Sequence, residues 1–149
     1  GMLQVPGGSI NVVPGRCQFS LDMRAPTDAQ RDALVKDVLA QVEGICHRRG
    51  VAYALEETMR ASAAPSDARW QARWESAVAA LGVPIYRMPS GAGHDAMKLH
   101  EIMPQAMLFV RGENSGISHN PLESTTSDDM QLGVQAFQNL LNHLASDPL

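Results

Sequence analysis

The sequence has 149 residues, of which 44% are hydrophobic and 19% charged; this suits one ordinary domain or two small lobes and argues against disorder. The formal net charge of -4 and the scattered Lys and Arg residues exclude a basic surface for nucleic acid or for anionic lipid. No apolar run approaches the roughly 18 residues of a membrane span, and no signal peptide is evident. We therefore expect a cytoplasmic protein with no nucleic-acid or membrane partner. Cys17 and Cys46 fit two reduced thiols, the alternative being a bond between them.

The chain begins with a segment whose pattern predicts two strands around a tight turn. Residues 10–13 read as extended, Pro14 and Gly15 supply the turn, and residues 17–23 alternate in polarity. In the second of these strands the apolar side chains fall on one face, namely Cys17, Phe19, Leu21 and Met23.

A helix is predicted next, between clear start and stop signals. Thr27 can cap its N-terminus and Gln30 completes a capping box. Gly50 supplies the C-terminal stop, and residues 51–58 read again as a strand. The helix should bury its regularly spaced apolar residues, Leu34, Val38, Val42 and Ile45. The first lobe, residues 1–62, is therefore predicted as strand, strand, helix, strand.

The small-residue stretch 61–65 is the best candidate boundary, and it places the second lobe at residues 63–149. Ser66 is predicted to cap a helix that Gly82 ends, and residues 83–86 should form a short buried strand. The apolar face of this helix is expected to consist of Trp70, Trp74, Ala77, Val78 and Leu81.

The rest of the second lobe alternates loops with apolar elements. A short helix is predicted from Asp95 to Ile102, and the continuous apolar run 106–110 is typical of a central strand covered on both faces. After a long loop, Ser127 should cap the last helix. That helix should bury Met130, Val134, Phe137, Leu141 and Leu144. The predicted fold class is α+β (α/β in the broad sense), with two lobes.

Two loops carry an unusual density of polar residues. In Ser90–Asp95, glycines let the backbone approach a ligand closely, amides opening the helix at Asp95 could receive an anion, and His94 could point into the same space. The second loop, Gly116–Glu123, holds His119, whose neutral imidazole could bind a metal ion, and Glu123, which could orient a neighbour or act as a ligand. The alternative for each loop is a solvated surface segment with an incidental histidine.

The remaining ionisable residues do not complete a metal site. His47 lies at a helix C-terminus, where a cation is favoured, whereas His100 and His143 have no ligand partner at helical spacing. The adjacent pair Glu56 and Glu57 belongs to an alternating segment and suits a solvated face. A catalytic zinc usually needs three protein ligands, and that number is not found.

Several motifs in order closely resemble the N-carbamoyl-L-amino-acid hydrolases, a family that includes allantoate amidohydrolase and β-alanine synthase and is related to zinc aminoacylases and carboxypeptidases. The resemblance covers nearly the whole chain. It rests on Asn11-Val-Val-Pro-Gly15, Phe19-Ser-Leu-Asp-Met-Arg24, Ser90-Gly-Ala-Gly-His-Asp-Ala96, Met107-Leu-Phe-Val-Arg111 and Gly116-Ile-Ser-His-Asn-Pro-Leu-Glu123.

The resemblance implies a role for five residues. His119 would ligate one of two metal ions, and His94 would bind or polarise the scissile group as the catalytic residue of this chain. Asn11 and Arg24, from a lid domain, would hold the substrate carboxylate, since a guanidinium meets both carboxylate oxygens at once. Gly93 would add a backbone contact to that carboxylate. The lobes would be the C-terminal parts of a lid (dimerisation) domain and of a catalytic domain.

One departure limits this implication. Family members are over twice as long, and the part without a counterpart here holds the His-x-Asp pair, the adjacent glutamates and a further metal histidine. We therefore expect a C-terminal fragment of a metal-dependent amidohydrolase that does not hold zinc stably and is inactive alone. The alternatives are a non-catalytic dimerising or small-carboxylate-binding module, and complementation by a second polypeptide. Open sheet edges favour a homodimer.

Overall fold

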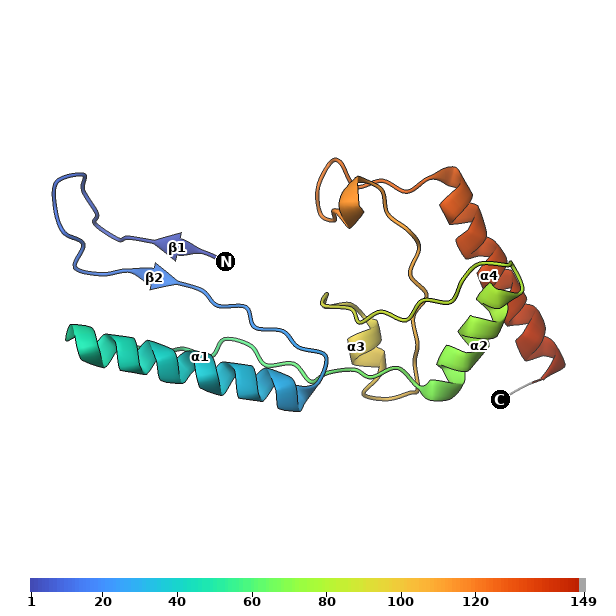
Figure 1. The fold of residues 1–149 in the computed structure, drawn as a ribbon, viewed down its shortest axis with the longest axis horizontal. Helices are drawn as coiled ribbons and strands as arrows, with labels where there is room; N and C mark the ends of the chain where they lie inside the picture. Colours follow the sequence, from blue (N-terminus) through green and yellow to red (C-terminus); the bar gives the residue numbers. More distant parts are fainter. Residues whose placement is uncertain (148–149) are drawn as a thin grey trace. The chain divides into compact units, whose positions relative to one another are not determined.

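The computed structural model describes residues 1–147 and divides into two compact units, Gly1–Ala63 and Ala64–Leu149. The first unit contains strands β1 (Leu3–Gln4) and β2 (Gln18–Phe19) and helix α1 (Asp28–Arg49). The second contains helices α2, α3 and α4 and a short 3-10 turn, η1 (Figure 1). The bounds of the second unit's elements are α2 Ala68–Ala79, α3 Ala96–Leu99, η1 Asn114–Gly116 and α4 Ser127–Ser146. The fold is α+β.

Helix α1 begins and ends at the predicted residues. The Thr27 hydroxyl accepts a hydrogen bond from the Gln30 amide at 3.3 Å, which satisfies an amide that has no partner inside the helix. At the other end Gly50 adopts the left-handed conformation, with φ of 61°, and its amide donates to the Cys46 and His47 carbonyls. Both capping predictions are confirmed.

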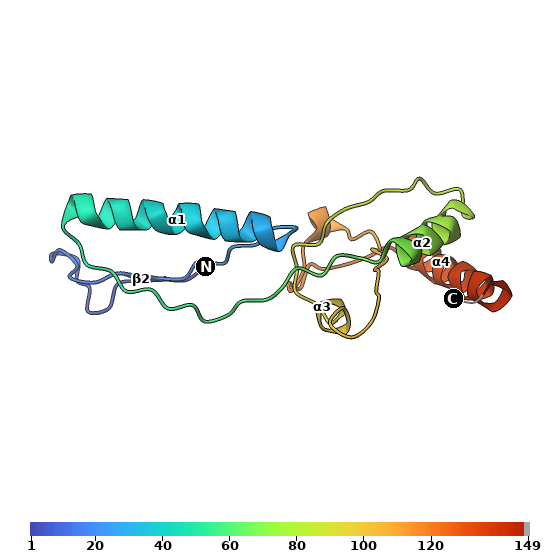
Figure 2. The same cartoon turned by 90° about the horizontal axis from the view of Figure 1, so that it is seen from below.

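The hairpin of the first unit differs from the prediction. β2 pairs antiparallel with β1, so that Leu3 faces Phe19 and Gln4 faces Gln18, and Figure 2 shows this pair beside α1. Residues 10–13 form no strand; a single bridge between Ser9 and Val12 closes a turn there instead. The predicted pairing across Pro14 and Gly15 was wrong, because a strand is defined by its partner and the alternating pattern does not name the partner.

Residues 51–58 were predicted as a strand and form none. The end of this segment is fastened to the first turns of α1 by charged side chains: Arg60 pairs with Asp32 at 2.9 Å and with Glu57 at 3.0 Å, and the Asp28 carboxylate accepts from the Ala63 amide at 2.8 Å. The apolar stripe of α1 is only partly covered: Val38 and Val42 are half-buried, whereas Leu34 and Ile45 are exposed.

In the second unit, α2 and α4 both begin one residue away from the predicted cap. Asp67, not Ser66, caps α2, and its carboxylate accepts from the Arg69 and Trp70 amides at 3.0 and 3.1 Å. Thr126, not Ser127, caps α4, and its hydroxyl accepts from the Asp129 amide at 3.0 Å. In both cases the neighbouring residue presents the better-placed oxygen to the second or third amide of the helix.

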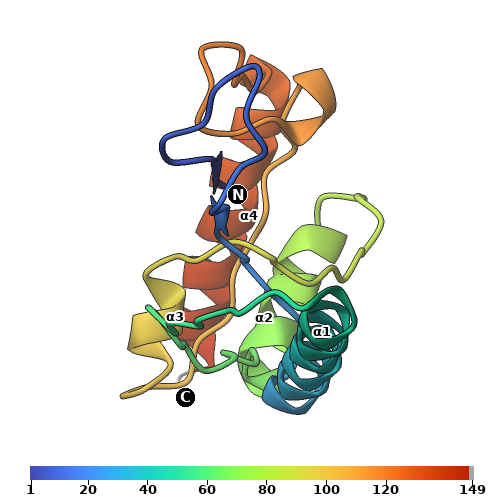
Figure 3. The ribbon, with the colours of Figure 1, turned by 90° about the vertical axis from the view of Figure 1, so that its left-hand side faces the viewer.

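The core of the second unit lies where α2 packs against α4 (Figure 3). Its buried residues are Ala77 of α2, with 0% exposure, and Ala136 and Leu140 of α4, with 2% and 4%. The Trp74 and Phe137 rings lie 5.9 Å apart at the margin of this contact, and the Asn139 side chain donates to the Ala77 carbonyl at 3.1 Å.

Most of the predicted inner face of α4 is exposed, namely Met130, Val134, Phe137 and Leu141. Two of its members take part in packing nonetheless, since the Phe137 ring lies 5.9 Å from that of Trp74 and Leu144 is half-buried. Alanines at the contact let the two helices approach closely, so the helix turns its small-residue face toward α2. Helix α4 therefore has two apolar faces, of which α2 covers one.

The apolar segments 83–86 and 106–110 were predicted as strands, and neither pairs with another strand in the described part of the chain. They run as extended chain beside the helices (Figure 1). One side of 106–110 is close to α4: a Cβ at Gly133 would lie 3.0 Å from the Val110 Cγ2 atom. Helical hydrogen bonds form within one segment, whereas a strand needs a neighbour.

Within residues 1–147, none of the helices has the length and apolar character that crossing a bilayer would require. Cys17 is exposed and Cys46 half-buried, and both are free thiols.

Candidate functional site

The Gly-rich loop places His94 at the start of a short helical turn. The Ser90 hydroxyl accepts from the Ala92 amide at 3.2 Å, and the His94 carbonyl accepts from the Met97 amide at 3.0 Å. The predicted helix Asp95–Ile102 is shorter in the structure: α3 spans Ala96–Leu99 only. One turn of helix has a small dipole, so the expected anion site at these amides finds little support.

The imidazole of His94 has an unusual environment. Its Nδ1 atom is buried and has no hydrogen-bond partner among the described residues. Buried polar atoms are nearly always paired, and an exception needs a reason. Gly93 beside it is exposed, and a Cβ at that position would meet only the Met97 sulfur at 3.9 Å. The backbone here is therefore open to close approach by a ligand, next to a ring nitrogen that lacks a partner.

The second loop holds His119 in a left-handed backbone conformation, with φ of 55°. Such a conformation costs a non-glycine residue on the order of 1 kcal/mol or more. The Glu123 carboxylate accepts a hydrogen bond from the His119 amide at 2.9 Å, which stabilises this conformation. Glu123 thus orients its neighbour, one of the two roles considered for it, and it does so through the backbone. The His119 side chain is exposed.

A residue missed by the sequence analysis closes this loop. The Asn114 side chain donates to the Leu122 carbonyl at 2.7 Å, and the Glu113 amide donates to the Ser124 carbonyl at 2.9 Å. Asn114 and Ser115 both have positive φ, of 50° and 62°. The sequence Asn-Ser-Gly contained a signal for this turn, because Asn tolerates the left-handed region and bonds to nearby backbone.

The two residues expected to hold a carboxylate both lie in the first unit. Asn11 is in the loop that joins the strands, where its Oδ1 accepts from the Ser9 hydroxyl at 2.9 Å. Arg24 lies five residues beyond β2. The other three predicted site residues, Gly93, His94 and His119, belong to the second unit.

Arg24 already binds a carboxylate. Its Nε donates to Asp22 Oδ1 at 2.9 Å and its Nη2 donates to Asp22 Oδ2 at 2.6 Å. This two-point hydrogen bonding holds the pKa of the Asp22 carboxyl below its usual range. This is the bidentate geometry in which a guanidinium binds a carboxylate, and in this structure the carboxylate that Arg24 binds is that of Asp22.

The donor atoms present do not fit a metal ion. No group of three His, Cys, Asp or Glu side chains in the described part of the chain is arranged to hold one. The Glu123 carboxylate accepts a hydrogen bond from the His119 amide. A catalytic zinc needs about three protein ligands, so His119 could contribute one ligand to a site that other residues complete.

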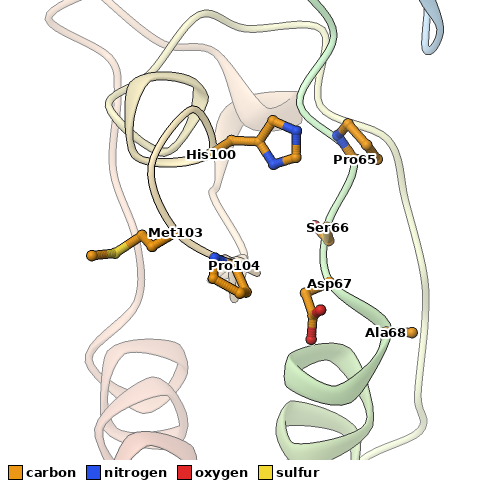
Figure 4. A pocket seen from close by; sticks show the side chains of 7 residues that line it. All are labelled: Pro65, Ser66, Asp67, Ala68, His100, Met103 and Pro104. Carbon is orange, nitrogen blue, oxygen red and sulfur yellow. The ribbon is translucent and has the colours of Figure 1, made fainter.

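An open hollow lies between the start of α2 and the turn after α3 (Figure 4). His100 and Pro65 face each other across its upper part, and the Asp67 carboxylate lies at its lower end. That carboxylate already caps α2. None of the predicted site residues lines the hollow, and its chemistry supports a structural role.

The chain was compared with known proteins. Residues 4–143 match the peptidase family M20/M25/M40. The chain is 37% identical to an allantoate amidohydrolase of Bacillus subtilis (strain 168), over 91% of this chain and 32% of that protein. It is 34% identical to an N-carbamoyl-L-amino acid amidohydrolase of Geobacillus stearothermophilus, over 97% of this chain and 35% of that one. A probable allantoate deiminase of Oryza sativa subsp. japonica is also 34% identical, over 98% and 32%.

The chain spans about a third of the length of these relatives. The match extends over both units, from the β1 strand to α4, and it includes the two loops that carry His94 and His119. The resemblance to the allantoate and N-carbamoyl-amino-acid amidohydrolases is therefore confirmed, and the chain belongs to the peptidase family M20/M25/M40.

Proposed function

We propose that this chain supplies the substrate-binding residues, and one metal ligand, of an enzyme that hydrolyses N-carbamoyl amino acids or related C–N amide bonds. The observation that carries the proposal is the buried Nδ1 of His94, which has no partner among the described residues, in the Gly-rich loop of an M20-family chain. Once the atoms that cover it move aside, a substrate amide or ureido group can donate to such a nitrogen or accept from it, depending on the tautomer of the ring.

Three further residues would hold the substrate's carboxylate. Arg24 supplies the fork that now binds Asp22, and Asn11 and Gly93 would add an amide and a backbone contact. The Asp22 carboxylate engages the Nε and Nη2 donors of Arg24, so a substrate carboxylate would displace it from that edge of the guanidinium or use the remaining N–H groups. A displacement would conserve the number of charge-assisted hydrogen bonds, and the gain would then come from the additional contacts.

His119 would contribute an imidazole to a metal centre, which zinc or another divalent ion would occupy in the complete enzyme. A bound zinc would supply a Lewis acid and an activated water. The described residues of this chain do not form that centre by themselves, so we assign no metal-dependent step to them, and we propose that the isolated chain is inactive and does not hold zinc stably.

Substrate binding is tested by NMR titration of the 15N-labelled chain with N-carbamoyl-L-alanine, using its carboxamide as the ligand that lacks the carboxylate. We expect the acid to shift the Arg24 Nε and His94 ring signals, and Arg24→Lys to weaken binding at least fivefold because a Lys lacks the two-point fork. The control is Arg16→Lys, in the strand-joining loop. Equal binding of acid and carboxamide would contradict the proposal.

Inactivity is tested by incubating the purified chain with N-carbamoyl-L-amino acids at saturating zinc. The expected result is no hydrolysis above the rate of zinc alone. Turnover at an enzyme-like, zinc-dependent rate would show that the chain completes a metal centre.

The first unit would correspond to part of a lid and dimerisation domain, and the second to part of a catalytic domain. A second candidate function, a non-catalytic dimerising module, is favoured by the two-residue strands β1 and β2, whose outer edges lack a strand partner in the described chain. Sedimentation at micromolar to millimolar concentration tests it: a homodimer that Phe19→Lys dissociates supports this function, and a monomer throughout contradicts it.

A further inference from the structure

The loop that carries His119 contains every non-glycine residue with a positive φ angle in the described part of the chain. These residues are Asn114, Ser115 and His119, with φ of 50°, 62° and 55°. A left-handed backbone costs free energy for a residue that has a Cβ atom, and glycine would adopt it more cheaply. Three such residues in one short loop persist only where the surrounding contacts hold them.

The two ends of this loop are joined by hydrogen bonds. The Glu113 amide donates to the Ser124 carbonyl at 2.9 Å, and the Ser124 hydroxyl donates to the Glu113 carboxylate at 2.9 Å. The Asn114 side chain donates to the Leu122 carbonyl at 2.7 Å. Donors and acceptors both lie within residues 113–124, so the loop is closed by its own groups.

A path of contacts leads from Asn114 to the backbone of His119. Asn114 holds the carbonyl of Leu122, the residue before Glu123, and the Glu123 carboxylate accepts from the His119 amide at 2.9 Å. Glycine at position 114 would permit the same φ angle but could not donate to the Leu122 carbonyl. The side chain of Asn114 therefore has a use beyond its tolerance of the left-handed region.

We propose that Asn114 is a positioning residue for His119, and that the loop 113–124 takes its shape in this chain alone, before a metal ion or further polypeptide is bound. The inference rests on the proposed role of His119 as a metal ligand. A backbone that is already fixed lowers the cost of ordering the imidazole when it binds. The groups that complete the centre would then meet a loop that is already formed.

The test is an NMR comparison of the isotope-labelled, metal-free chain with two Asn114 variants. The amide and Hα protons of one residue lie closer together at positive φ, so we expect a strong nuclear Overhauser effect between them at His119 in the parent chain. Asn114→Gly and Asn114→Asp both tolerate the left-handed region and both lack the N–H donor. Each should weaken this effect and raise the exchange rate of the His119 amide roughly threefold to fivefold.

The two variants differ in charge and in chain flexibility, so an effect that they share reports the lost donor. The matched control is Asn142→Asp, an exposed asparagine of α4 whose Oδ1 accepts from the Gln138 side chain, a bond that an aspartate can keep. It should leave the His119 signals as in the parent chain. The amides of α2 and the midpoint of thermal unfolding should stay unchanged in the Asn114 variants, because a positioning role is confined to the loop.

Three results would overturn the proposal. One is a parent chain in which the His119 amide exchanges at the unprotected rate and shows no strong Overhauser effect. Another is parent-like behaviour of His119 in both Asn114 variants. The third is faster exchange that extends equally to α2, which would make Asn114 a residue of general stability.

No substrate or metal ion enters these measurements, so their outcome is separate from that of the substrate titration. Equal binding of acid and carboxamide in that titration would refute the proposed function and leave the measured loop geometry in place. A loop that is unformed in the parent chain would refute the positioning role, and the titration would still decide whether the chain binds a substrate carboxylate.

Discussion

The α2–α4 pair and the segments 83–88 and 106–110 carry similar apolar sequences, yet only the helices form regular structure with a buried core. A helix satisfies its backbone within itself, so its apolar face needs only a surface to rest on. An extended segment needs a second backbone before it becomes a strand. The apolar content of a segment therefore predicts that its side chains will be buried. Its backbone hydrogen bonds, in contrast, depend on which other segments lie beside it.

The largest loss of stability is expected where α4 packs against α2. Leu140 is 4% exposed and its neighbour Leu141 is 46% exposed, so Leu140→Ala should lower the free energy of unfolding of the second unit by about 2 to 3 kcal/mol. Leu141→Ala, the matched control, should cost less than about 1 kcal/mol. Urea unfolding followed by circular dichroism measures both. Equal losses would mean that α4 contacts α2 through the face predicted from sequence.

A smaller effect tests how α4 begins. Thr126→Ala removes the hydroxyl that accepts from the Asp129 amide and should cost about 1 kcal/mol. Ser127→Ala, one residue on, removes no cap hydrogen bond and should stay within about 0.5 kcal/mol of the parent protein. Thermal denaturation of the two variants side by side separates the caps. A reversed order would restore Ser127 as the cap.

The His119 loop is irregular, yet side chains of the loop itself hydrogen-bond to its backbone. It is therefore intermediate between the self-sufficient helices and the unpaired extended segments. Glu123→Ala removes the carboxylate that accepts from the His119 amide, and the exchange rate of that amide should rise roughly fivefold to tenfold, because one charge-assisted hydrogen bond is lost. Glu113→Gln is the control, since Glu113 binds the Ser124 hydroxyl in the same loop. NMR exchange measurements would refute this account if both variants behaved alike.

The smallest effect concerns the ion pairs of Arg60 with Glu57 and Asp32 in the first unit. The hydrogen bond from Arg60 lowers the pKa of Glu57 from its ordinary value of 4.5. A lowered carboxyl pKa contributes stability above the ordinary value, and that stability is lost as the pH falls through the folded value. The contact should therefore persist at neutral pH and weaken as the pH falls below the ordinary value of 4.5 and through the lower pKa of the folded state.

Arg60→Gln should raise the Glu57 pKa toward its ordinary value, as followed by carbon NMR of the carboxyl group. Arg69→Gln is the control, because among the described residues Arg69 pairs only with Asp67, in the second unit. An unchanged Glu57 titration in Arg60→Gln would show that this ion pair does not form in solution.

Sequence reasoning predicted the features that depend on a few adjacent residues. The Thr27 cap, the left-handed Gly50 and the two polar loops with their histidines were all visible in the printed sequence. Its errors share a different origin. The partner of β2, the covered face of α4 and the state of 106–110 depend on segments distant in the chain, and periodicity contains no information about them. The shift from Ser66 to Asp67 is the small local error expected when two capping residues are adjacent.

The candidate site was predicted to a similar extent. The polar loops were located, whereas the hydrogen bond of Glu123 with the His119 amide was not predicted. Two features required coordinates: the buried Nδ1 of His94 and the occupation of Arg24 by Asp22. Both depend on side-chain orientation, which neither spacing nor resemblance specifies.

The Val110 side chain lies close to the position that a side chain at Gly133 would occupy. Glycine costs a helix interior about 1 kcal/mol relative to alanine, so Gly133 in α4 needs a compensating reason, and the Val110 methyl group 3.0 Å from its missing Cβ provides one. The pair acts as a spacer that sets how near α4 lies to residues 106–110. A larger residue at 133 therefore requires the Val110 methyl group to shift by a few tenths of an ångström, and a smaller residue at 110 would remove that requirement.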